Sequence, residues 1–136
     1  MRYLVKARIR PEQQEALLRA IESRRLGWGS VAGDEYLHDM EHARRLDDGT
    51  ICWLETCFCP TPLQEELPYW EEYFEILRIK NAHARSRCRD LNGVEPWACC
   101  DCDCTRVLEE RMSSWGVGYL QWQRDAACRT EGQDTA

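Results

Sequence analysis

The spacing of apolar residues changes at Pro11, and this change is the strongest guide to the fold. Before it, apolar and mostly basic side chains alternate over residues 2–10, which is typical of a β-strand with one buried face. Pro11 suits the first position of a helix, because that position needs no backbone N–H donor. Apolar residues then follow helical spacing until Gly27, a typical helix terminator. The chain is therefore predicted to begin with a strand and a helix over 11–26.

Similar patterns predict the remaining elements. Asp48-Gly49 is a strong signal for the turn of a hairpin. Between Glu75 and Lys80 the pattern fits two structures: a helix continuing from Pro62, which we favour, and a strand, which the β-branched Ile76 and Ile79 would suit. The further predicted helices cover 34–40, 62–80, 82–90, 105–114 and 119–128, and the further strands cover 41–46, 50–59 and 94–102.

The element order β-α-α-β-β-α-β, followed by a helix, resembles that of the ferredoxin-like α+β superfamily, and in particular its dimeric α+β barrel type. The resemblance covers roughly residues 1–104 and implies a βαββαβ sandwich with an added C-terminal helix. It also implies that the first strand is central, with the third and fourth strands antiparallel on either side. In such proteins an open sheet face forms a homodimer. We expect Trp53 on that face, together with Glu55, Lys6 and Arg8.

Length and charge narrow the class of protein. The 136 residues suit a single α+β domain over 1–124, with a core over 1–104 and a helical extension over 105–124. Residues 125–136 carry no packing pattern and are predicted to be disordered. A net charge of −6 argues against a nucleic-acid surface. The absence of a long apolar run and of a signal-peptide pattern predicts a cytoplasmic protein without membrane contact.

Cysteine is the main carrier of possible chemistry. The chain has nine cysteines, and in a reducing compartment clustered thiols indicate metal ligation or redox chemistry more than disulfides. Thiolates are soft donors that suit zinc or a similar transition-metal ion. The ferredoxin-like order brings the ends of two predicted strands to one sheet edge. The cysteines at those ends, and so the predicted metal ligands, are Cys57, Cys59, Cys99, Cys100, Cys102 and Cys104.

Two other interpretations stay open for these cysteines. In the first interpretation, they are small apolar residues that pack in the last strand. In the second, they are thiols beside a helix N-terminus that carry out redox chemistry. In the first case the protein is a dimeric ligand-binding protein or small enzyme with incidental cysteines, and its small-molecule ligand is unknown. The sequence contains no G-x-S-x-G, P-loop, G-x-G-x-x-G or H-E-x-x-H motif, so it leaves open whether the protein is an enzyme.

Histidine and arginine supply two weaker candidates. His38 and His42 have i, i+4 spacing and would chelate a metal ion only if their helix continued beyond Met40, where we expect it to end. Surface or core roles are therefore favoured for both. His83, Arg85 and Arg89 lie in a basic run that is suited to binding a phosphate or carboxylate. The alternative for this run is a solvated helix face.

Overall fold

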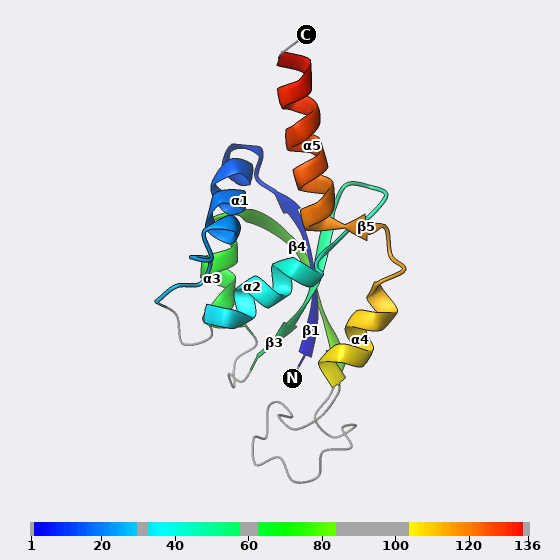
Figure 1. Ribbon diagram of the computed structural model, residues 1–136. Coiled ribbons are helices and arrows are strands. Elements are labelled where there is room, and N and C mark those ends of the chain that lie inside the picture. The colour runs from blue at the N-terminus through cyan, green and yellow to red at the C-terminus, as the bar shows by residue number, and fades with distance from the viewer. Residues whose placement is uncertain (1, 30–32, 58–62, 84–103, 135–136) are drawn as a thin grey trace.

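A computed structural model describes residues 2–29, 33–57, 63–83 and 104–134 (Figure 1). These residues form a mixed α+β structure around a five-stranded antiparallel sheet with the strand order β4-β1-β3-β2-β5. The α+β class predicted from the sequence is confirmed. The strands are β1 (Arg2–Ile9), β2 (Arg44–Arg45), β3 (Ile51–Thr56), β4 (Phe74–His83) and β5 (Val117–Gly118). The helices are α1 (Gln14–Glu22), α2 (Gly33–His42), α3 (Glu66–Trp70), α4 (Cys104–Met112) and α5 (Tyr119–Asp134).

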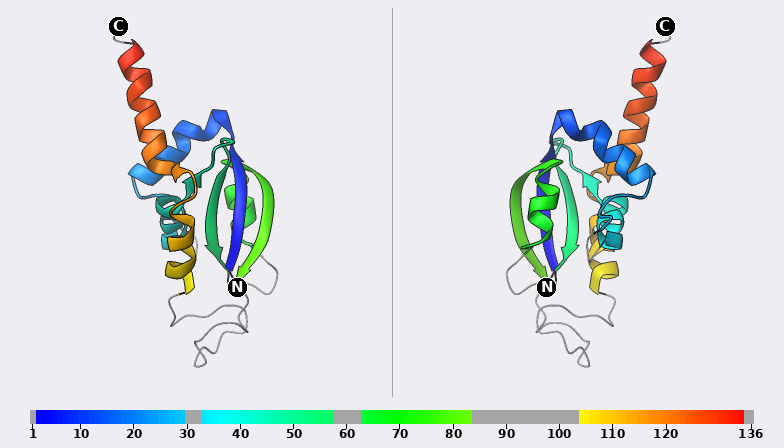
Figure 2. Two further views of the ribbon diagram at one scale, coloured as in Figure 1. Left: turned by 90° about the vertical axis from the view of Figure 1, so that its right-hand side faces the viewer. Right: turned by 90° about the vertical axis from the view of Figure 1, so that its left-hand side faces the viewer.

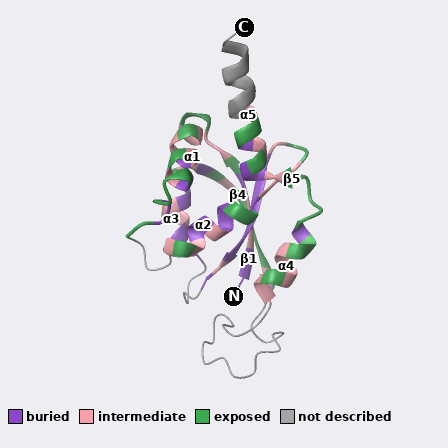
Figure 3. Ribbon diagram, in the orientation of Figure 1, coloured by how far each residue is buried: buried purple, intermediate pink, exposed green. Residues whose placement is uncertain are grey.

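One face of the sheet is packed against α1, α2, α3 and the start of α5. Val5 on β1 lies opposite Trp53 on β3, and residues opposite each other in antiparallel strands project from the same face. Both side chains are buried in one apolar cluster, with Leu17 of α1, Met40 of α2 and Trp70 of α3. Figure 3 shows the buried residues concentrated on the sheet and on the helix sides turned toward it. Most of the core lies on this face.

The other face is only partly covered. Cys52 and Leu54 are buried there beneath Met112 and Leu108 of α4, which packs beside β3. The views in Figure 2 place α3 on one side of the sheet and leave β1 and β4 without a described helix on the opposite side.

The prediction that Trp53 lies on the open face of the sheet is therefore wrong. Lys6 lies opposite Cys52, whereas Trp53 and Glu55 are buried on the side of Val5 and Tyr3. Alternation along a strand gives neighbouring residues opposite faces, so Trp53 cannot share a face with Lys6 in this register. The homodimer stays a prediction, without Trp53 to support it.

The helix favoured over Glu75–Lys80 is also wrong, because these residues belong to β4. Helix α3 ends at Trp70, and a turn leads into a strand that pairs with the whole of β1. Tyr73 accepts a backbone hydrogen bond from Arg10 at 2.8 Å, which holds the start of this pairing. The first two residues of the helix predicted over 82–90 lie in β4 as well. The rest of that helix and the strand predicted over 94–102 lie outside the described residues.

Several boundaries differ from the prediction while the elements agree. The helix predicted over 11–26 begins with a 3-10 turn at Pro11–Gln13 and ends at Glu22. Helix α2 continues to His42, and the strand predicted over 41–46 contracts to β2. Helix α4 agrees with the prediction over 105–114, and α5 continues to Asp134, into the segment for which disorder was predicted. Within the described ranges, no helix has both the length and the apolar character to cross a membrane.

Candidate metal centre

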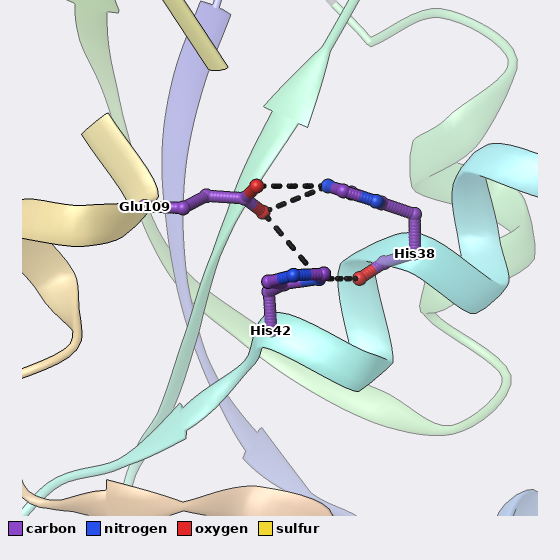
Figure 4. Close-up of side chains that lie close together, drawn as sticks. All are labelled: His38, His42 and Glu109. Carbon is purple, nitrogen blue, oxygen red and sulfur yellow. Dashed lines mark hydrogen bonds and ion pairs between the residues drawn. The ribbon is translucent and has the colours of Figure 1, made fainter. Parts of the chain in front are cut away.

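Two histidines of α2 face a glutamate of α4. Because α2 continues to His42, residues 38 and 42 lie one turn apart on the same side of the helix. Their rings are stacked, with centroids 4.2 Å apart. Glu109 approaches from α4, 71 residues further along the chain, and only 9% of its side chain is exposed. Figure 4 shows the three side chains converging from the two helices.

The distances among these groups are short. His38 Nε2 lies 2.9 Å and 3.0 Å from the two carboxylate oxygens of Glu109. The Nδ1 atom of His42 is 3.9 Å from Glu109 Oε2, and it donates to the carbonyl oxygen of His38 at 3.0 Å. The hydrogen bond to Glu109 raises the pKa of His38, against the opposing effect of burial. In the absence of an ion, the cluster is thus a hydrogen-bonded contact between α2 and α4.

The same arrangement fits the ligand set of a metal ion. One nitrogen from each histidine and one oxygen of Glu109 all lie within 4.8 Å of one another. Ligands bound to zinc at about 2.0–2.2 Å are separated by roughly 3.0–3.5 Å, so only small side-chain movements are needed. His38 would release the proton that it shares with Glu109. His42 would either give up its hydrogen bond to His38 or turn its other ring nitrogen toward the ion.

A pocket of about 490 Å³ adjoins the three side chains. Its further lining consists of Thr105, Arg106 and Glu110 of α4 and of Ser113, the residue that follows this helix. Three protein ligands leave at least one position of a tetrahedral ion free. An ion held here would therefore have room for water or a small molecule.

A pair of buried carboxyl groups lies behind the site, between α2 and β3. Asp39 and Glu55 are each only 1% exposed. Trp53 and Trp70 donate their indole N–H groups to Glu55 Oε2 at 2.8 Å and 3.0 Å. Burial raises the pKa of Glu55 to about 7, although hydrogen bonds from Asp39 and from these two indoles lower it, and nearby Glu66 raises it. Two carboxylates this deeply buried do not both ionise at neutral pH.

Asp39 is the member of the pair that keeps a proton. Burial raises its pKa well above the ordinary value, and the negative charges of Glu55, Glu35 and Glu109 add to the effect. As a carboxylate, Asp39 has no hydrogen-bond donor for either oxygen within the described ranges, whereas as a neutral acid it donates a hydrogen bond to Glu55. A neutral Asp39 beside Glu55, whose carboxylate is stabilised by the two indoles, is the arrangement with the lowest electrostatic cost.

Of the six predicted thiol ligands, the structure describes only Cys57 and Cys104. Cys57 is buried, and its sulfur lies 3.3 Å from the backbone nitrogen of Leu63. Cys104 begins α4. Arg2 connects the two regions, because it pairs with Thr56 in the sheet and donates to Thr105 Oγ1 at 2.7 Å. Cys59, Cys99, Cys100 and Cys102 lie outside the described residues, as do Arg85 and Arg89. His83 is the last residue of β4.

The sequence pointed to His38 and His42 as a possible chelating pair, but surface or core roles were favoured for both, and Glu109 was missed. The i, i+4 spacing of the histidines was a usable signal, but the helix was predicted to end near Met40. No local pattern connects Glu109 with them. In comparisons with known proteins, no family model, curated protein or solved structure matches the chain.

Proposed function

We propose that this protein binds a divalent transition-metal ion of the zinc type through His38, His42 and Glu109, and that the ion meets a small molecule in the adjoining pocket. The observation that carries the proposal is the convergence of three ligating atoms within 4.8 Å from two helices. Two imidazoles and a carboxylate are the ligand set of zinc centres with an open position, and also of some non-haem iron centres.

The chemistry of such an ion would be that of a Lewis acid. It would polarise an oxygen of the bound molecule or lower the pKa of a coordinated water. The protein would contribute a rigid ligand set on two helices. Arg106, which pairs with Glu110 at 2.7 Å, would supply a positive charge in the pocket wall.

The test is a titration of the protein with Zn²⁺, monitored by isothermal calorimetry. A parallel titration with Co²⁺ serves as the spectroscopic probe. We expect one equivalent to bind and the visible d–d bands of Co²⁺ to indicate nitrogen and oxygen ligands. The double substitution His38→Gln and His42→Gln is expected to weaken binding by at least about a hundredfold, because only one of three ligands remains. Glu110→Gln is the matched control, since it changes the charge next to Glu109 without removing a ligand. Equal affinity in the wild-type and double-variant proteins would disprove the proposal.

A second candidate is the thiolate site predicted from the sequence, with Cys57, Cys59, Cys99, Cys100, Cys102 and Cys104 as ligands for zinc or another soft cation. Its support is that Cys57 and Cys104 each adjoin a residue that contacts Arg2. The same Co²⁺ titration distinguishes the two sites. Thiolate ligation would produce a strong near-ultraviolet charge-transfer band that Cys57→Ser with Cys104→Ser reduces and that the histidine variants leave unchanged.

We also propose that the fold is ferredoxin-like, with β5, α4 and α5 as additions. The support is the order β4-β1-β3-β2, in which β1 lies between two antiparallel neighbours, although the fourth strand is Phe74–His83 instead of the predicted 94–102. A homodimer and a cytoplasmic location complete the proposal on the basis of the sequence.

A further inference from the structure

A row of cations lies on the part of the sheet that α4 leaves uncovered. Lys6 and Arg8 alternate along β1, and Arg78 and Lys80 alternate along β4. In the register of these strands Lys6 lies directly opposite Arg78, and Lys80 lies opposite Leu4. Opposite and alternate residues share a face, so all four cations project from the same side. Figure 2 shows no described helix over β1 and β4 on that side.

Among the described residues, carboxylates pair with only half of this row. Lys6 lies 3.5 Å from Asp48, and Arg8 lies 3.8 Å from Glu75. These pairs are exposed and therefore contribute little stability. Arg78 and Lys80 are exposed and have no ion-pair partner in the described part of the chain. Because like charges placed opposite each other in a sheet repel, an anion bound beside Arg78 would relieve the repulsion from Lys6.

The outer edge of β4 adds a second feature. Over the described residues, β4 pairs with β1 alone and ends the sheet on that side. Ile79 lies between Arg78 and Lys80, projects from the opposite face and is 36% exposed, and Leu77 on the same strand is 40% exposed. The outward N–H and C=O groups of an edge strand can pair with another extended chain.

We infer that β4 accepts an extended acidic segment of a partner protein as an additional strand. Acidic side chains at every second position of such a segment would meet Arg78 and Lys80, because both strands have a period of two. The apolar side chains between them would cover Ile79 from the other face. The inference is independent of the proposed metal site, from which it takes no residue.

The same features argue against two other occupants. In a symmetric dimer joined through β4 at Ile79, Arg78 of each copy would lie opposite Lys80 of the other, and Glu75 is already paired with Arg8. A single-stranded nucleic acid binds such a surface through aromatic rings as well as cations. Around the row of cations, the residues of this face are Leu4, Lys6, Arg8, Glu75, Arg78 and Lys80, and none of these six is aromatic.

The test measures how a fluorescein-labelled ten-residue peptide of alternating Glu and Val binds to the full chain. Fluorescence anisotropy monitors the binding. We expect saturable binding that weakens with added salt. Arg78→Glu combined with Lys80→Glu should weaken binding by at least about tenfold, since attraction becomes repulsion at two positions. The matched control is Arg19→Glu with Arg111→Glu, an equal charge change at exposed sites on α1 and α4. Unchanged affinity in the β4 variant would overturn the inference.

Two further probes separate strand addition from simple charge attraction. A peptide of the same composition with its glutamates grouped together should bind more weakly, and so should an alternating peptide with N-methyl groups along the edge that pairs. If either of these two peptides bound as tightly as the unmodified alternating peptide, strand addition would be overturned. Tighter binding of an oligothymidylate than of the alternating peptide would also overturn it. Sedimentation of the wild-type protein and of the β4 variant tests a second copy as the occupant. A dimer that the β4 substitutions dissociate would assign this part of the sheet to a second copy and would overturn the inference.

Discussion

At the residue scale, the buried carboxyl pair determines how stability depends on pH. The pKa of Glu55 is raised from 4.5 to about 7 by burial, so the folded state favours the protonated form more than the unfolded state does. The stabilisation is complete below about pH 4.5 and is lost as the pH rises through about 7. At about 1.4 kcal/mol per pKa unit, the loss is on the order of 3 kcal/mol.

Glu55→Gln is the variant that tests this effect. The amide oxygen still accepts the indole hydrogen bonds of Trp53 and Trp70, but the side chain no longer ionises. The decrease in the free energy of unfolding between pH 5 and 8 is therefore expected to be smaller in the variant than in the wild type. Urea denaturation across this range measures it, and parallel curves for the two proteins would refute the assigned role of Glu55.

At the element scale, the connection from α4 to β5 depends on a glycine. Gly116 has a φ of 53°, and a Cβ atom there would collide with the backbone carbonyl of Arg45 on β2. Gly29 has a φ of 88° with open space around it, and it serves as the matched control. Both alanine variants lose about 1–2 kcal/mol from left-handed backbone strain. Gly116→Ala should lose at least about 1 kcal/mol more, because the backbone of β2 must move.

Helix α5 is attached to the rest of the protein by its first turns. Tyr119 is fully buried and donates its backbone N–H to Ala43, while the Gln123 amide donates to the carbonyl of Gln14. Beyond these turns α5 extends away from the other elements (Figure 1). Deletion of residues 129–136 should change the free energy of unfolding by no more than roughly 0.5 kcal/mol. A substantially lower urea midpoint would indicate that the end of the helix is docked.

At the scale of the whole molecule, an ion at the candidate centre would strengthen an existing contact between two helices that pack on the same strand. Helices α2 and α4 both pack on β3, and their contact through Glu109 spans 71 residues of sequence. A ligand that binds only the folded state at a hundred times its Kd adds about 2.7 kcal/mol. Zn²⁺ should therefore raise the melting temperature of the wild type and of Glu110→Gln, a chelator should reverse the rise, and the double histidine variant should show none.

The sequence by itself determined the elements whose evidence is local. The alternation before Pro11, the helix after it, the Asp48-Gly49 turn and the apolar spacing of α4 depend on neighbours within a few residues. These features were sufficient to identify the α+β class and the start of each of these elements. Their physical basis is short-range: backbone conformation, capping and the period of side chains along one strand or helix.

Only the tertiary structure decided the rest. Residues 75–80 have a pattern compatible with both helix and strand, and pairing with β1 selects the strand. The register of β1 with β3 places Trp53 in the core, whereas each strand alone shows only that its two faces differ. Glu109 reaches His38 and His42 because α4 returns to β3 after a long connection. Contacts of this kind depend on how distant segments pack together, and no period within either segment encodes them.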